Sequence, residues 1–313
     1  MAKFQLTDKI REVAKASGID ALRFAAADPF DRYVIGGSRR RDPKLSLPEA
    51  KTIIVAGIYI GGVTLPAWGD YNYGRTSRLF LSGFFLDIVK PLEPIAELLE
   101  QAGHKAMICK GYSKEESILP LKLAAQRAGL GRQGKHSLLI TKKCSTFLAL
   151  GGILTTAELE HHTKEESDRC RNGTKCQEAC PVGALDQAYV LNMKKCMSYR
   201  LQVEKLPPDV KAVMENRVLD CEICQDSCPW NKKHIDNPLE TRTTAAFREK
   251  IKKWEDVFYL PHLRDLTESD FNKLFGRLKA DIPFKLFRRN VMIALERSEQ
   301  AANAGRLIPF SER

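Results

Sequence analysis

Hydrophobic and polar positions follow the periods of helices and strands along the first part of the chain. Residues 3–17 carry apolar side chains at helical spacing and end at Gly18, so they predict an amphipathic helix. Residues 21–27 predict a first strand. The run TIIVAGIYIG at 52–61 is apolar and β-branched, which is typical of a central strand buried on both faces. We therefore expect a domain of mixed helix and sheet.

The pattern continues with further helices and strands. Residues 79–101 predict one long helix that stops at Gly103, and residues 104–111 a strand. A helix then leads into the glycine-rich turn AGLGRQGKHS at 128–137, and the strands expected over 137–141 and 147–156 should pair. The longest apolar stretch, 79–89, is shorter than the roughly 18 residues of a membrane span. It predicts a core helix, and no membrane partner is expected.

Seven of the nine cysteines lie between residues 170 and 228, at spacings typical of two-cluster ferredoxins. In the run C-x2-C-x2-C-x3-C-P, three thiolates bind one iron–sulfur cluster and the fourth crosses to the other. The first run here has Gly173 at its second position. The second run is split, with its first ligand detached. The cysteines are Cys170, Cys176 and Cys180 in the first run, and Cys196, Cys221, Cys224 and Cys228 in the second.

The crossover rule assigns every one of these cysteines to a 4Fe-4S cluster. Cluster A would be bound by Cys170, Cys176 and Cys228, and cluster B by Cys180, Cys196, Cys221 and Cys224. Cluster A lacks one thiolate because Gly173 holds that position. Its fourth iron could bind water or a non-cysteine side chain, or be absent as in a 3Fe-4S cluster, and the sequence leaves these alternatives open.

A zinc site and a disulfide framework are the alternative uses of these cysteines. Zinc sites commonly pair two C-x2-C steps, and only Cys221 and Cys224 form such a step. The N-terminal residues lack the continuous apolar centre of an export signal, so we expect the protein in the cytoplasm, where thiols stay reduced. Cys109 and Cys144 have apolar neighbours in sequence and are expected to be buried thiols rather than ligands.

The composition indicates a basic protein with a full core. A chain of 313 residues predicts two or more structural units, which we place at 1–163, 164–237 and 238–313. A net charge of +11 and a pI near 9.2 favour an anionic partner, such as RNA, an anionic cofactor or an electron donor. A merely solvated basic surface is the alternative, because the charges are scattered.

The glycine-rich turn contains G-x-G-x-x-G at Gly129, Gly131 and Gly134, between a helix and a strand. This is the reverse of the order in dinucleotide-binding folds, where the glycines follow a strand and open a helix. We therefore expect the glycines to let the backbone approach a large flat ligand or the neighbouring cluster.

These motifs, with ENRVLDCEICQDSCPWN and the closing RRNVMIAL, resemble the epoxyqueuosine reductase family, which is related to the corrinoid reductive dehalogenases. The resemblance covers about residues 47–295. It implies an α+β fold: an α/β cobalamin-binding domain of the reductive-dehalogenase or nitroreductase type, an inserted two-cluster ferredoxin-like module and a short helical C-terminal tail. It also implies base-off cobalamin, an electron donor such as ferredoxin or flavodoxin, tRNA as substrate, and a monomer.

The resemblance also implies roles for individual residues. Glu115 and Tyr112 are the candidate proton donors, and the candidate cofactor-binding residues are Gly129, Gly131, Gly134, Lys135, His136 and Ser137. Arg132 and His136 stand where family members usually have Trp and Asn, and the helical region after the clusters is short. Two functions stay open: a corrinoid-dependent reductase of tRNA or a small molecule, and an electron-transfer or corrinoid-handling protein without an organic substrate.

Overall fold

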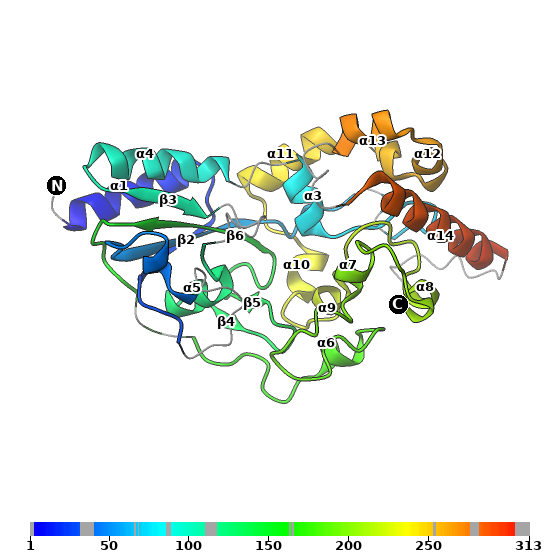
Figure 1. Ribbon diagram of the computed structural model, residues 1–313, viewed down its shortest axis with the longest axis horizontal. Helices are drawn as coiled ribbons and strands as arrows, with labels where there is room; N and C mark the ends of the chain where they lie inside the picture. Colours follow the sequence, from blue (N-terminus) through cyan, green and yellow to red (C-terminus); the bar gives the residue numbers. More distant parts are fainter. Residues whose placement is uncertain are drawn as a thin grey trace.

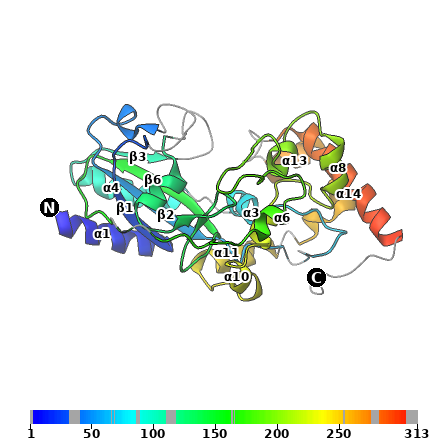
Figure 2. The same cartoon turned by 90° about the horizontal axis from the view of Figure 1, so that it is seen from below.

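The structure is a computed structural model of the 313-residue chain. It describes residues 3–31, 41–65, 67, 69–85, 89–109, 118–162, 164, 166–252, 255–275 and 282–303. Within these residues a sheet lies at one end and a group of helices at the other, with the cysteine-rich segment between them (Figures 1 and 2). No helix in this part of the chain has both the length and the apolar content to cross a membrane.

A four-stranded antiparallel sheet organises the N-terminal half (Figure 1). In spatial order its strands are β1 (Ala21–Ala26), β2 (Thr52–Tyr59), β6 (Leu148–Thr155) and β3 (Ala106–Cys109). All 8 residues of β2 are buried, and β2 lies between β1 and β6. The continuous apolar run is thus confirmed as a central strand.

Helices cover both faces of this sheet, which explains why its central strand is apolar throughout. They are α1 (Lys3–Ala16) and α4 (Glu93–Gln101) on one face and α5 (Leu121–Arg127) on the other. Two adjacent glycines in β6 let the helical segments on the two faces pack close to this strand. A Cβ on Gly151 would lie 2.8 Å from Leu92 Cδ1, and a Cβ on Gly152 would lie 2.8 Å from Leu121 Cδ2.

The single helix predicted for residues 79–101 is wrong. The chain instead forms α3 (Arg78–Phe85), the 3-10 turn η2 (Lys90–Leu92) and then α4. Pro91 lies at the start of η2, and Pro94 lies in the first turn of α4. Proline fits the first turn of a helix but removes a hydrogen bond from its interior. The two prolines therefore start new helices where the apolar pattern alone indicated a continuous one.

The predicted pairing of residues 137–141 with 147–156 is also wrong. β5 (Leu139–Ile140) pairs with β4 (Arg132–Gln133) in a small hairpin, whereas β6 pairs with β2 along its whole length. Because β6 and β2 have 8 residues each, their pairing satisfies more backbone groups than a pairing with the short β5. The glycine-rich turn consequently becomes the tip of the β4–β5 hairpin.

The cysteine-rich segment is made of short helices joined by loops (Figure 2). They are α6 (Lys175–Glu178), α7 (Met197–Arg200), α8 (Pro208–Val213), α9 (Ile223–Asp226) and α10 (Lys232–Asp236). Both views place α6 and α10 between the sheet and the last helices of the chain, and Figure 1 shows α9 beside α10.

The helices that follow the cysteines form a packed core with the end of the sheet. They are α11 (Arg242–Ile251), η3 (Glu255–Phe258), α12 (Leu260–Asp265), α13 (Glu268–Phe275) and α14 (Phe284–Asn303). Phe247, Phe258 and Phe287 are fully buried with Tyr59 and Phe147 of the N-terminal half. The predicted helical tail is thus anchored to the rest of the fold.

Candidate metal centre and cofactor site

The seven cysteines of residues 170–228 gather into two neighbouring sets. Burial, followed by the nearby thiols of Cys170 and Cys176, raises the pKa of Cys228 to about 11. Burial also raises the pKa of Cys224, and the nearby thiols of Cys221, Cys196 and Cys180, followed by that of Cys176, raise it further. The first set is Cys170, Cys176 and Cys228, and the second is Cys180, Cys196, Cys221 and Cys224.

This donor set fits iron–sulfur clusters. Burial raises the pKa of Cys221 to about 12, so this thiol stays protonated at neutral pH unless a metal offsets the charge of its thiolate. All nine cysteines lie in the described part of the chain, and none forms a disulfide. Cys109 and Cys144 are buried elsewhere, as predicted. Among the described residues, no three Cys, His, Asp or Glu side chains are placed to hold a single metal ion.

Backbone N–H groups point at two of the sulfurs. Lys135 N donates to Cys170 Sγ at 3.4 Å, and Ala184 N donates to Cys180 Sγ at 3.3 Å. Such donors stabilise thiolate charge and tune the reduction potential of a cluster. Lys135 lies at the tip of the β4–β5 hairpin, so the glycine-rich turn contacts the first set of cysteines directly.

The glycines of this turn fit against the protein itself. A Cβ on Gly131 would lie 2.4 Å from Ile140 O, and a Cβ on Gly134 would lie 2.7 Å from Ile140 Cδ1. Gly129 has a φ of +67°, and its Cβ would lie 2.4 Å from Lys164 O. Packing against backbone oxygens therefore requires glycine at positions 129 and 131, whereas a Cβ at position 134 would displace only side-chain atoms, such as the end of Ile140. The role of the three glycines toward a cofactor stays a prediction.

His136 presents a buried donor that lacks an acceptor. Its side chain is 2% exposed, and Nδ1 accepts a hydrogen bond from Leu138 N at 3.1 Å. Burial, and then the charge of Lys122, lowers the pKa of His136 to about 4, so the ring is neutral and carries its proton on Nε2. Nε2 has no partner among the described residues. A buried polar atom of this kind fits a bound group that supplies an acceptor, such as a carboxamide of cobalamin.

Hydrogen bonds fix the hairpin to Tyr189, which in turn binds Asp168 in the loop before Cys170. Gln133 Nε2 donates to Tyr189 O at 2.9 Å, and Tyr189 N donates to Lys135 O at 3.0 Å. Tyr189 OH donates to Asp168 Oδ2 at 2.7 Å. Lys122 Nζ donates to Ser137 O at 2.9 Å on the other side of the turn. The hairpin tip and the first cysteine set thus form one site.

The two predicted proton donors, Glu115 and Tyr112, fall in residues 110–117, which lie outside the described residues. Their role stays a prediction.

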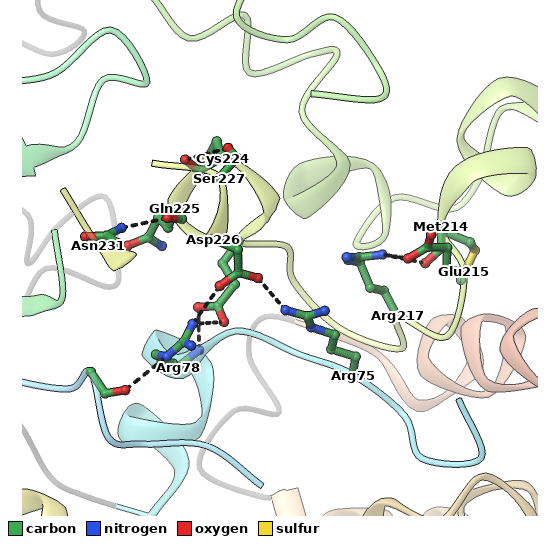
Figure 3. A network of polar contacts seen from close by, with 12 residues as sticks. Arg75, Arg78, Met214, Glu215, Arg217, Cys224, Gln225, Asp226, Ser227 and Asn231 are labelled. Carbon is green, nitrogen blue, oxygen red and sulfur yellow. Dashed lines mark hydrogen bonds and ion pairs between the residues drawn. The ribbon is translucent and has the colours of Figure 1, made fainter. Parts of the chain in front are cut away.

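A buried ionic network holds the segment around Cys224 to the N-terminal half (Figure 3). Arg78 Nη1 donates to both Glu222 and Asp226, and Arg75 donates to Asp226. Arg78 N also donates to Glu222 Oε2 at 3.0 Å. Burial raises the pKa of Glu222, and the charge of Arg78 opposes this rise. Because Glu222 and Asp226 flank Cys224, the network positions the second cysteine set.

Two further residues complete this attachment. Asp220 accepts hydrogen bonds from Cys221 N at 2.8 Å and from the hydroxyl groups of Ser77 and Ser198. Asn231 Nδ2 donates to Thr146 Oγ1 at 2.7 Å. Sequence reasoning missed all of these contacts. The acidic residues interleaved with cysteines in DCEICQD were the available signal, because buried acids need cationic or hydrogen-bonding partners.

Comparisons with known proteins agree with this geometry. Residues 169–231 match the family described as a 4Fe-4S double cluster binding domain. An epoxyqueuosine reductase from Prochlorococcus marinus is 30% identical in an alignment 317 residues long. The alignment covers 91% of this chain and 96% of that protein.

Two solved structures share the fold. One is an epoxyqueuosine reductase with an epoxyqueuosine-modified tRNA stem loop, at a TM-score of 0.73 and 22% identity, covering 96% of this chain and 84% of that one. The other is a reductive dehalogenase whose structure suggests a mechanism for B12-dependent dehalogenation. It has a TM-score of 0.52 and 16% identity, covering 93% of this chain and 38% of that one. The predicted fold class is thereby confirmed.

Proposed function

This chain belongs to the epoxyqueuosine reductase family, and we propose that it is an iron–sulfur, cobalamin-dependent reductase that removes the epoxide oxygen of epoxyqueuosine in tRNA. The observation that carries the proposal is the gathering of seven cysteines into two adjacent sets, one of which contacts the hairpin tip at Lys135. Residues 1–163 would bind cofactor and substrate, residues 164–237 the clusters, and residues 238–313 would pack behind them.

The residues of this chain have distinct parts in such a reaction. When bound, the clusters supply one-electron transfer and cobalamin supplies a strongly reducing cobalt. Lys135 N–H stabilises the sulfur of Cys170 at the side of the clusters that faces the hairpin. His136 Nε2–H donates to an acceptor on the cofactor. Glu115, with Tyr112 as the second candidate, protonates the departing oxygen, because an oxygen that leaves carbon needs a proton.

The substrate and the electron donor are proposed from the net charge of this chain and from its similarity to proteins of known structure. The net charge of +11 favours the phosphate backbone of tRNA, and the solved relative named above holds a modified tRNA stem loop. A ferredoxin or flavodoxin, being anionic as a class, suits the same basic surface. The chain would act as a monomer.

The test is a cobalamin titration of the anaerobically purified protein, followed by its visible spectrum. We expect a shift to the base-off form, and loss of one oxygen from epoxyqueuosine-containing tRNA, measured by mass spectrometry, when a reductant is added. His136→Leu removes the buried donor and should weaken cobalamin binding by about tenfold, the cost of one hydrogen bond of about 1.4 kcal/mol.

His136→Gln is the matched control, because its amide retains an N–H donor and should restore most of the affinity. An unchanged spectrum at saturating cobalamin would contradict the reductase. The chain would then be a two-cluster electron carrier or a corrinoid-handling protein.

A further inference from the structure

We propose that one iron of cluster A has no protein ligand, faces solvent and binds a small exogenous thiolate. Cluster A is the cluster of Cys170, Cys176 and Cys228, and the inference rests on the proposed two-cluster function. Gly173 stands at the second position of the C-x2-C-x2-C-x3-C-P run, where a thiolate would complete the set. Among the described residues, the carboxylates nearest to Gly173 in sequence, Asp168 and Glu178, already accept hydrogen bonds.

The backbone does not require glycine at position 173. Its φ lies outside the left-handed region, so an L-residue is allowed there. A Cβ would meet Cys170 O at 3.2 Å, a contact that a shift of a few tenths of an ångström relieves in this exposed loop. Cysteine could therefore occupy the position, and its replacement by glycine changes the ligand set without being imposed by the fold.

The open position faces water. Residues 171–175 are all exposed, whereas Cys176 and Cys228 are 7% and 5% exposed. The cluster would thus be buried on the side of these two thiolates and open on the side of Gly173. Arg171 and Lys175 flank this opening in sequence, and their positive charges favour an anionic ligand.

The acidic side chains nearest in sequence already have partners. Asp168 Oδ1 accepts a hydrogen bond from Cys170 N at 2.9 Å, and Asp168 Oδ2 accepts one from Tyr189 OH at 2.7 Å. Glu178 accepts a hydrogen bond from the hydroxyl group of Thr174. Recruiting either carboxylate to iron would break these contacts, so a ligand from solvent is favoured.

Ligand exchange at this iron is balanced without any change of oxidation state. A water molecule leaves, the thiol binds as its thiolate, and its proton passes to solvent. Thiolate is the preferred ligand because iron in iron–sulfur clusters is bound by thiolates. Binding should strengthen as the pH approaches the ordinary thiol pKa of about 8.5, since more of the ligand is then deprotonated.

The experiment compares three anaerobically reconstituted proteins: wild type, Gly173→Cys and the matched control Asn172→Cys. The control places a thiol one position out of register in the same exposed loop. The probe is 2-mercaptoethanol, and the readouts are iron and sulfide per chain and the electron paramagnetic resonance spectra of the reduced and mildly oxidised proteins. Cluster B, with four thiolates, is the internal reference.

In the wild type, we expect 2-mercaptoethanol to shift the spectrum of one cluster only. Mild oxidation should remove one iron and produce a three-iron signal. Gly173→Cys should abolish both effects, and Asn172→Cys should retain them. Two thiol-insensitive clusters in the wild type, or identical behaviour of the two variants, would overturn the inference while leaving the reductase intact. Fewer than about three irons per chain would instead contradict the two-cluster function itself.

Discussion

Removal of the Arg78 side chain tests whether the ionic network holds the cysteine segment in place. Arg78 and Glu222 are 3% and 2% exposed, and Arg78 Nη1 also lies 3.0 Å from Asp226 Oδ1. Its guanidinium lies 4.5 Å from the ring centroid of Phe147. In the variant Arg78→Met, Asp226 keeps Arg75, whereas the buried Glu222 keeps the hydrogen bond from the backbone N–H of residue 78 and the charge of Arg75, without a direct ion pair.

The loss of stability in Arg78→Met follows from the burial of the Glu222 carboxylate without its ion-pair partner. Breaking a buried ion pair by removing one partner destabilises a protein by about 3–5 kcal/mol. For a chain of 313 residues, 1 kcal/mol corresponds to roughly 1.5 °C in Tm, from an unfolding entropy of about 2.1 cal/mol/K per residue. Arg78→Met should therefore lower Tm by about 5–8 °C.

The assay is thermal unfolding of cluster-loaded protein under anaerobic conditions, followed by circular dichroism. Lys105→Met is the control, because Lys105 and Glu49 form an exposed ion pair at 3.1 Å, for which a change of less than about 2 °C is expected. Adding Glu222→Gln to Arg78→Met should recover at least half of the loss, since the amide carries no charge. A loss from Arg78→Met as small as the control, or no recovery in the double variant, would refute the reasoning.

Two further predictions concern the clusters and the partner. Cys224→Ala should lower iron per chain by about half, because it removes a ligand of cluster B, whereas Cys109→Ala in β3 should leave the iron content unchanged; equal losses would contradict the ligand assignment. Affinity for tRNA should fall as salt rises, with log K linear in log salt, because each phosphate contact releases counterions. An affinity that stays constant between about 50 and 200 mM salt would count against a basic binding face.

The parts of the fold that could be predicted from sequence are those encoded over short distances. The central strand follows from one continuous apolar run, and the two cysteine sets follow from ligand spacings within residues 170–228. The prediction of one helix over 79–101 was wrong because it gave the helical spacing of apolar residues more weight than Pro91 and Pro94. The hairpin was missed because β4 has only 2 residues, too few for any pattern.

The contacts that position the site could not be predicted in the same way. Arg78 is separated from Glu222 by 144 residues and from Asp226 by 148, and Arg75 is separated from Asp226 by 151. A single sequence shows charged residues at these positions but not which of them meet. His136 was a candidate cofactor-binding residue from the sequence, but its buried, unpartnered nitrogen could not be predicted, because it depends on how the hairpin folds back on itself.

The ionic network also constrains the order in which this protein can mature. Arg75 and Arg78 leave the ribosome well before Glu222 and Asp226, so a nascent chain that ends before residue 220 contains the arginines without their acids. Burying these two guanidinium groups without their acidic partners leaves less charge compensation, which disfavours the final position of α3 at that stage. Docking of α3 and closure of the loop around Cys224 are therefore coupled and occur late. Supplying residues 164–237 as a separate electron-transfer module would divide one folding unit into two incomplete pieces.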